Sequence, residues 1–165
     1  PFILHPMEGS SVFINQPDYF EIPEDVIVVG MENAENFMQI RSQRWLLDAL
    51  FPGKQLLFVC RYPQENLENL RSWLLRIPNR YVHFGDFDLA GVHIYLSEFY
   101  AHLGDRSSFL LPSDIEERLA EGNAALYNQQ YARFKNMAVT DIRLQLLVNM
   151  IHHYRRGYEQ EGYIR

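Results

Sequence analysis

Short apolar runs alternate with stretches of helical periodicity through the first two-thirds of the chain, and this alternation constrains the fold more than any other feature. Residues 26–30, 56–60, 81–84 and 108–111 form the apolar runs, each of a length typical of a strand. Between them, apolar side chains recur every three or four positions, as on one face of a helix. This alternation predicts an α/β fold, a parallel doubly wound sheet of about four strands with helices on both faces.

Local signals predict where the helices begin and end. Asn33 can cap the first expected helix, and the Pro-Gly pair at 52–53 stops it. Pro63 suits the first turn of the second helix, where a missing N–H group costs little. The third helix is expected over about residues 89–103, with Gly104 ending it.

We expect a single domain in three parts: a leading segment over residues 1–25, a core over 26–111 and a helical extension over 112–165. Residues 11–14 of the leading segment are typical of a short β-like piece, before a turn. In the extension, Ser-Asp-Ile-Glu at 113–116 is a capping box that opens a helix ending near Gly122. Further helices are expected over residues 124–136 and 141–156.

The composition is that of a folded protein. The chain has 165 residues, of which 47% are hydrophobic and 22% charged, enough for one domain with a substantial core. No apolar run approaches the length of a membrane span. The chain opens at Pro1 without a Met, so we expect it to be the C-terminal part of a longer protein.

A single cysteine, Cys60, excludes an internal disulfide and a cysteine zinc site. It falls inside the apolar run at 56–60, which together with the run at 26–30 we expect to be a strand buried on both faces. Cys60 is therefore expected to be a buried small hydrophobe. This cysteine usage predicts a reducing, cytoplasmic location.

The formal net charge of −6 argues against a domain that binds nucleic acid tightly by itself, because such domains are usually basic. It does not exclude an enzyme that acts on phosphodiesters. A bound metal would cancel part of the negative charge. A basic upstream or partner domain could supply the remaining attraction.

Carboxylates follow two of the expected strands. Glu32 comes directly after the first apolar run, and Asp86 and Asp88 come after the third. The carboxyl ends of strands in an open α/β sheet face one crevice, and the two aspartates, two positions apart, project to the same side of an extended backbone. Three converging carboxylates would suit a hard cation, Mg²⁺ or Mn²⁺. Gly85 and Gly91 would let backbone and substrate approach closely.

Each of these residues also has a structural interpretation. Asp88 could be the N-cap of the helix that begins at residue 89, and Asp86 an ordinary loop residue. Glu35, one turn after Glu32, is more typical of a solvated helix carboxylate than of a site residue. His83 is more typical of a satisfied structural histidine than of a ligand.

Basic residues near the strand ends are candidates for contacts to nucleic-acid phosphates. Arg61 is the best placed, because it follows the second apolar run directly. Arg41 and Arg44 on the first helix are further candidates. His93, five residues after Asp88, could approach a phosphate from the third helix.

The motifs Val-Val-Gly-Met-Glu-Asn, within residues 26–37, and Gly-Asp-Phe-Asp-Leu-Ala-Gly, within residues 83–94, resemble those of the Toprim domain shared by topoisomerases, primases and several nucleases. The chain most resembles the Toprim subunit of Wadjet anti-plasmid systems and the A subunit of topoisomerase VI, over about residues 26–111. The resemblance implies that Glu32 is a metal ligand or general acid/base and that Asp86 and Asp88 bind metal. Leu89 departs from the proline that often follows the second aspartate in this family, and it leaves the metal pair intact.

The resemblance implies a metal-dependent endonuclease, a hydrolase that cleaves phosphodiesters of nucleic acid, with DNA as the expected substrate. Topoisomerase VI-type enzymes also use a tyrosine on a separate winged-helix domain, which is not visible here. The alternative is a non-catalytic Toprim-like module that binds a partner protein for assembly or regulation, in a protein complex or a homodimer. Glu159 and Glu161 belong to a Glu-Gln-Glu similar to one near the end of Wadjet-type proteins, and their role stays open.

Overall fold

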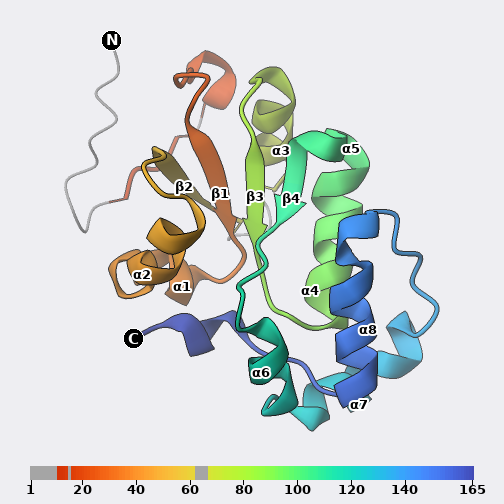
Figure 1. Ribbon diagram of the computed structural model, residues 1–165. Coiled ribbons are helices and arrows are strands. Elements are labelled where there is room, and N and C mark those ends of the chain that lie inside the picture. The colour runs from red at the N-terminus through yellow and green to blue at the C-terminus, as the bar shows by residue number, and fades with distance from the viewer. Residues whose placement is uncertain (1–10, 15, 62–66) are drawn as a thin grey trace.

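A computed structural model, which describes residues 11–14, 16–61 and 67–165, contains one sheet of four parallel strands (Figure 1). The order across the sheet is β2-β1-β3-β4. The strands are β1 (Ile27–Met31), β2 (Leu56–Cys60), β3 (Tyr81–Phe84) and β4 (Ser107–Phe109). The predicted α/β class is confirmed, and each strand lies within two residues of its expected position.

The two central strands form the middle of the core. Every residue of β1 and β3 is buried, because each strand has a neighbour on both sides and helices cover the sheet. Strand β2 is only half-buried along its whole length, so the prediction of a second fully buried strand is wrong. The reason is its place at the edge of the sheet, which the sequence pattern does not encode. Cys60 is accordingly half-buried rather than buried.

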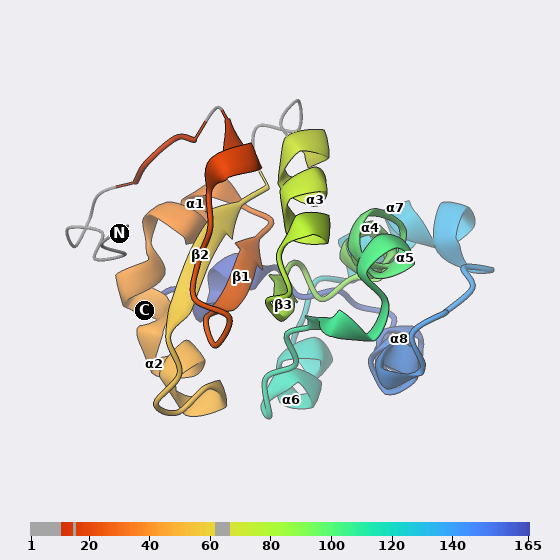
Figure 2. The ribbon, with the colours of Figure 1, turned by 90° about the horizontal axis from the view of Figure 1, so that it is seen from above.

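The crossovers cover both faces of the sheet. The chain moves from β1 to β2 in one direction and then to β3 and β4 in the other. Since such connections are right-handed, the helices of the first crossover and those of the later two lie on opposite faces. The connection from β1 to β2 contains α1 (Ala34–Met38) and α2 (Ile40–Leu50). The connection from β2 to β3 contains α3 (Leu67–Arg76), and the one from β3 to β4 contains α4 (Leu89–Ile94), η3 (Tyr95–Tyr100) and α5 (Ala101–Leu103). Figure 2 shows α3 and α6 (Ile115–Ala120) on opposite sides of the sheet.

Two expected helices have internal irregularities. The first divides into α1 and α2 at Gln39, whose backbone has φ −107° and ψ 34°. Gln43 fills the break, because its amide group donates to the carbonyl oxygens of Asn36 (2.8 Å) and Gln39 (3.1 Å). The third expected helix begins at Leu89, as predicted, but its middle part, η3, is π-helical. It ends at Gly104, whose backbone has φ 56°. Pro63, the expected start of the second helix, lies outside the described residues.

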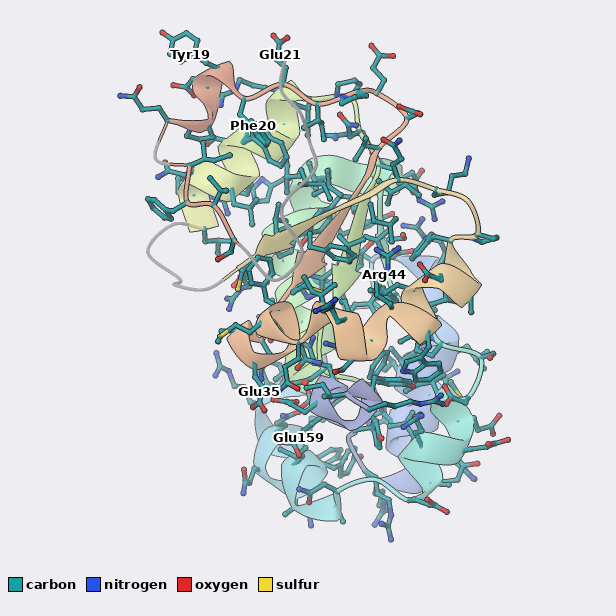
Figure 3. All side chains as sticks on the ribbon, turned by 90° about the vertical axis from the view of Figure 1, so that its left-hand side faces the viewer. Tyr19, Phe20, Glu21, Glu35, Arg44 and Glu159 are labelled. Atoms are coloured by element: carbon teal, nitrogen blue, oxygen red, sulfur yellow. The ribbon has the colours of Figure 1, made fainter. Side chains whose placement is uncertain are left out.

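The described part of the leading segment contains no strand. Residues 11–14 are exposed and not paired with the sheet, so the β-like interpretation of this piece is wrong. The expected turn is a 3-10 helix, η1 (Pro17–Tyr19). After it, Phe20 packs on Trp73 of α3 with ring centroids 5.5 Å apart, and the Trp73 indole donates to the Phe20 carbonyl oxygen at 2.8 Å. Figure 3 shows Phe20 directed toward α3, while Tyr19 and Glu21 point outward.

The last third of the chain is helical, as predicted, with α6 followed by α7 (Ala124–Phe134), η5 (Ile142–Leu144) and α8 (Gln145–Tyr154) (Figure 1). The predicted capping box is wrong. Asp114 is the N-cap residue of α6, but its side chain makes no capping hydrogen bond. A capping box over 113–116 needs Ser113 as the N-cap, but α6 begins one residue later, and the Glu116 carboxylate accepts from the Tyr154 hydroxyl at 3.1 Å. The Asp114 carboxylate accepts from the Arg118 guanidinium (2.7 Å) and the Tyr163 hydroxyl (3.2 Å).

After α8 the chain turns back to the sheet. Arg155 takes the left-handed conformation with φ 53°, and residues 157–165, here called the C-terminal strap, cross below the carboxyl ends of the strands (Figure 1). Tyr158 of the strap pairs with Phe87 through two backbone hydrogen bonds of 2.9 and 3.1 Å. Tyr163 is fully buried and contacts the rings of Phe84 and Phe87. The strap thus places chain from the C-terminus next to the loop that carries the two aspartates.

Candidate metal centre

Glu32, Asp86 and Asp88 all lie at the carboxyl edge of the two central strands. The backbone N–H of Glu32 donates to the Phe84 carbonyl oxygen at 3.0 Å, which continues the β1–β3 ladder by one residue. Asp86 and Asp88 follow β3 after a single glycine. Burial raises the pKa of both aspartates, and the negative charge of Glu32 adds to the rise, so the fold brings the three side chains within electrostatic reach of one another.

Asp86 carries the most perturbed carboxyl group of the three. Its pKa is raised to about 7, mainly by burial and additionally by the charges of Glu32, Asp88 and Glu161, while a hydrogen bond from the Gln160 backbone N–H to Oδ1 (2.8 Å) opposes the shift. Near neutral pH this group is divided between its charged and neutral forms. A cation at this position would favour the charged form.

Asp88 has a structural role as well as a place in the cluster. It is the N-cap of α4, and its Oδ1 accepts from the Gly91 backbone N–H at 2.8 Å. Its Oδ2 accepts from the Gln130 amide of α7 at 2.7 Å. The N-cap interpretation is therefore confirmed. Burial raises the Asp88 pKa, the two hydrogen bonds oppose this, and the charge of Glu32 adds to the rise.

Glu32 is joined to a buried chain of side chains on β3. Its Oε2 lies 3.2 Å from Nε2 of His83, and Nδ1 of His83 lies 3.1 Å from the hydroxyl oxygen of Tyr81. A Cβ atom on Gly85 would overlap Glu32 Oε2, so the glycine allows this side chain to approach the backbone closely, while the expected approach of substrate stays a prediction. Gly91 is required in the same way, because a Cβ there would overlap the Asp86 carbonyl oxygen. His83 is buried and satisfied, as a structural histidine should be, but its partner is a candidate site residue.

A fourth carboxylate, Glu161, reaches the cluster from the C-terminal strap. Its Oε1 accepts from the side-chain amide of Asn33, the neighbour of Glu32. Within the described part of the chain, its Oε2 is buried without a hydrogen-bond partner. Its charge contributes to the raised pKa of Asp86. In the sequence, only the Glu-Gln-Glu at 159–161 drew attention to Glu161. Nothing local in these three residues predicts that the strap returns to the sheet.

The carboxylate oxygens of this site suit a hard cation, although the side chains are not arranged around a single point. Four partly or fully buried carboxylates, one with an unpartnered oxygen, offer only oxygen ligands, which Mg²⁺ prefers. Among the residues that the structure describes, however, no group of three or more His, Cys, Asp or Glu side chains is arranged to hold one ion. Mg²⁺ usually keeps several waters and shares its coordination with substrate phosphates, so two carboxylates can suffice on the protein side.

Comparison with known proteins gives a family and no further likeness. A family model described as a domain of unknown function, DUF7281, matches residues 4–165, nearly the whole chain. The chain belongs to this family. No curated protein matches it, and no solved structure matches it. Over the described residues of this DUF7281 chain, no helix has the length and apolar character needed to cross a bilayer.

The candidate phosphate contacts are dispersed around the molecule. Arg61 follows β2 as expected, but it is only 9% exposed and forms a two-fold ion pair with Glu98, with both N···O distances 2.6 Å. Because Glu98 neutralises the guanidinium charge and occupies two of its N–H groups, Arg61 is poorly suited to bind a phosphate. His93 lies half-buried on α4 with its ring 5.0 Å from that of Phe134, beside a hollow that none of the four carboxylates lines.

The remaining predicted residues lie on the first crossover. Arg41 is exposed on α2. Arg44, labelled in Figure 3, also lies on α2 and pairs with Asp48 at 2.8 Å. Glu35 is exposed on α1 and accepts from the Gln39 side chain at 3.2 Å. Its solvated position agrees with the prediction that it stands outside the site.

Proposed function

We propose that this chain cleaves phosphodiester bonds of nucleic acid, DNA in the first place, in a reaction that depends on Mg²⁺ or Mn²⁺. The observation that carries the proposal is the gathering of Glu32, Asp86 and Asp88 at one edge of a parallel sheet, with the Asp86 pKa raised to about 7. Strongly perturbed carboxyl groups of this kind are typical of functional sites. The Toprim-like motifs that contain the three residues support the same chemistry.

Each carboxylate has a distinct part in the proposed reaction. Asp86 and Asp88 would hold the ion, and Asp88 would do so from a position set by the Gly91 N–H group and the Gln130 amide. Glu32 would complete the site or move a proton at its carboxylate. When bound, Mg²⁺ polarises the phosphate and stabilises charge on the leaving oxygen.

The proposed substrate requires help from outside this domain. With a net charge of −6, the chain by itself would attract a polyanion weakly. We therefore infer that a basic upstream or partner domain, in a protein complex or a homodimer, brings the DNA to the site. A DNA substrate and a single cysteine in the sequence would both suit a cytoplasmic location. The Wadjet-like motifs suggest a role in anti-plasmid defence.

Nicking of supercoiled plasmid at low salt tests the proposal. Asp86→Asn and Asp88→Asn are each expected to abolish Mg²⁺- or Mn²⁺-dependent nicking, while Glu35→Gln serves as the control because that carboxylate is exposed and outside the cluster. Circular dichroism of all variants checks that the fold survives. Undiminished nicking in both aspartate variants would exclude the proposed site.

One observation favours the non-catalytic module instead. The described side chains do not form a ready cation cage, and both aspartates already accept hydrogen bonds from Gln160, Gly91 and Gln130. Melting in increasing Mn²⁺ separates the two functions, because a ligand that binds only the folded state raises stability by about 2.7 kcal/mol at a hundred times its Kd. The enzyme hypothesis expects a rise in Tm that Asp86→Asn removes, whereas an assembly module expects none.

A further inference from the structure

We propose that His83 is a positioning residue that orients Glu32 for the reaction, and that Tyr81 fixes the imidazole in the tautomer this requires. The inference rests on the proposed function, because Glu32 needs orientation only if it acts on the metal or on a proton. It adds two residues to which the Toprim resemblance assigns no role. Their contacts form a continuous chain from the middle of β3 to the carboxyl edge of the sheet.

Tyr81 and His83 project from the same face of β3, because they are two residues apart on a strand. Both are completely buried. Tyr81 stacks on Phe99 with ring centroids 4.7 Å apart, and His83 lies between Phe99 (5.0 Å) and Phe109 (5.6 Å). The imidazole is therefore packed among aromatic rings, with Nε2 toward Glu32.

The hydrogen-bond chain has a defined direction. A carboxylate only accepts hydrogen bonds, so Nε2 of His83 carries the proton that faces Oε2 of Glu32. Nδ1 of the neutral imidazole is then an acceptor, and Tyr81, whose pKa burial raises well above its ordinary value, keeps the proton that it donates there. The Nε2–H group donates to Oε2 of Glu32 over 3.2 Å. The Glu32 carboxylate therefore receives a donor of fixed direction, as the ligands of metal sites commonly do.

Two glycines make room for this chain, one at each end. A Cβ on Gly30 of β1 would overlap the Tyr81 hydroxyl and come within 2.6 Å of Cζ of its ring. A Cβ on Gly85 would overlap Oε2 of Glu32 and come within 2.7 Å of His83 Nε2. Real Cβ atoms do not approach other atoms so closely, so both backbone positions are shaped around the contacts of the chain.

The described contact engages Oε2 of Glu32, which leaves Oε1 as the oxygen that would meet an ion or a proton. Asp86 and Asp88 are held differently, by backbone N–H groups of Gln160 and Gly91. Removing the imidazole would therefore loosen Glu32 while leaving the aspartate pair in place. Loss of such an outer partner typically lowers metal affinity or activity ten- to a hundredfold.

The test compares His83→Leu, His83→Gln and Tyr81→Phe in the whole chain. Leucine removes the donor, glutamine restores an N–H group at a similar distance along the side chain, and Tyr81→Phe removes only the hydroxyl in case His83→Leu does not fold. We expect about tenfold or greater loss of kcat for nicking in His83→Leu with little change in KM. A smaller loss is expected in Tyr81→Phe, and glutamine should recover most of the activity.

Two measurements besides activity complete the test. Mn²⁺ affinity by calorimetry should fall in His83→Leu and recover in His83→Gln. Nitrogen-15 NMR of the wild-type imidazole should show the proton on Nε2; a proton on Nδ1 overturns the inference. If Asp86→Asn is inactive while His83→Leu and Tyr81→Phe match the wild type in kcat and Mn²⁺ affinity, the inference fails by itself. If Asp86→Asn keeps full activity, the proposed function fails and the inference falls with it.

Discussion

The backbone N–H of Gln160 donates to Oδ1 of Asp86 at 2.8 Å, across 74 residues of the chain. This bond ties the C-terminal strap to the candidate metal centre. The Gln160 carbonyl oxygen in turn accepts from the Asn36 amide at 3.0 Å, so the strap bridges the loop after β3 and the helix after β1. The C-terminal strap therefore lies against the carboxylates of the candidate metal centre, and one of its residues, Glu161, adds its own carboxylate.

Stability should depend on pH through Asp86. Its pKa is raised from 3.8 to about 7 in the folded protein, so between these values the folded state binds more protons than the unfolded state. Stability without metal should then fall as pH rises from about 4 to about 7, by up to about 4 kcal/mol for a shift of this size. Urea unfolding in EDTA at pH 5 and pH 8 measures this. Asp86→Asn should make the free energy of unfolding less dependent on pH. An equally steep pH dependence in that variant would show that Asp86 is not its cause.

Glu161→Gln should lower the pKa of Asp86. The charge of Glu161 is one of the causes of the raised value, and glutamine removes that charge while it retains an oxygen that can accept from Asn33. Carbon-13 NMR of the Asp86 carboxyl group, titrated in the wild type and the variant, gives the comparison. Glu159→Gln is the matched control, because this residue of the same segment is exposed (Figure 3). An unchanged Asp86 titration in Glu161→Gln would show that the strap does not act on the site.

Gly85→Ala should impair the site through a single methyl group. The added Cβ would overlap Oε2 of Glu32, so the carboxylate must move away from His83. We expect at least a tenfold loss of Mn²⁺-dependent nicking, since a small displacement of a site residue can cost this much. Gly53→Ala is the comparison: its Cβ would meet no atom within 4 Å, but φ is 68°, so it should cost about 1 kcal/mol of stability and no activity. Equal activity in the two variants would argue against a role for the Glu32 orientation.

Arg61 should prove structural rather than a phosphate contact. It pairs with Glu98 through two bonds of 2.6 Å, and only about a tenth of its side chain is exposed. Arg61→Met should destabilise the fold by about 3 kcal/mol, because it leaves Glu98 partly buried and unpaired. The double variant with Glu98→Leu should recover much of that loss in urea unfolding. If the double variant is as stable as wild type but loses DNA binding, this result would support a contact between Arg61 and a nucleic-acid phosphate.

The repeated strand–helix pattern was sufficient to predict the parallel sheet and the positions of its strands. Apolar runs of strand length, separated by helical periodicity and clear stop signals, leave few other arrangements, and Glu32, Asp86 and Asp88 could be placed at one sheet edge for that reason. The edge position of β2 was not predictable, because an apolar run looks the same whether one or two strands flank it. The capping box failed because α6 begins one residue later than the box requires, with Asp114 as its N-cap, and because Glu116 pairs with Tyr154 of α8.

The sequence by itself determined which elements form and which carboxylates end the strands, since these depend on local periodicity and chain direction. Only the tertiary structure decided what surrounds the carboxylates. His83 meets Glu32, Gln160 meets Asp86, and Glu161 enters the cluster through contacts between residues 51, 74 and 128 positions apart. Such pairings come from packing of the whole domain around its buried aromatic core, where distant segments are brought together to cover apolar surface and satisfy buried polar groups.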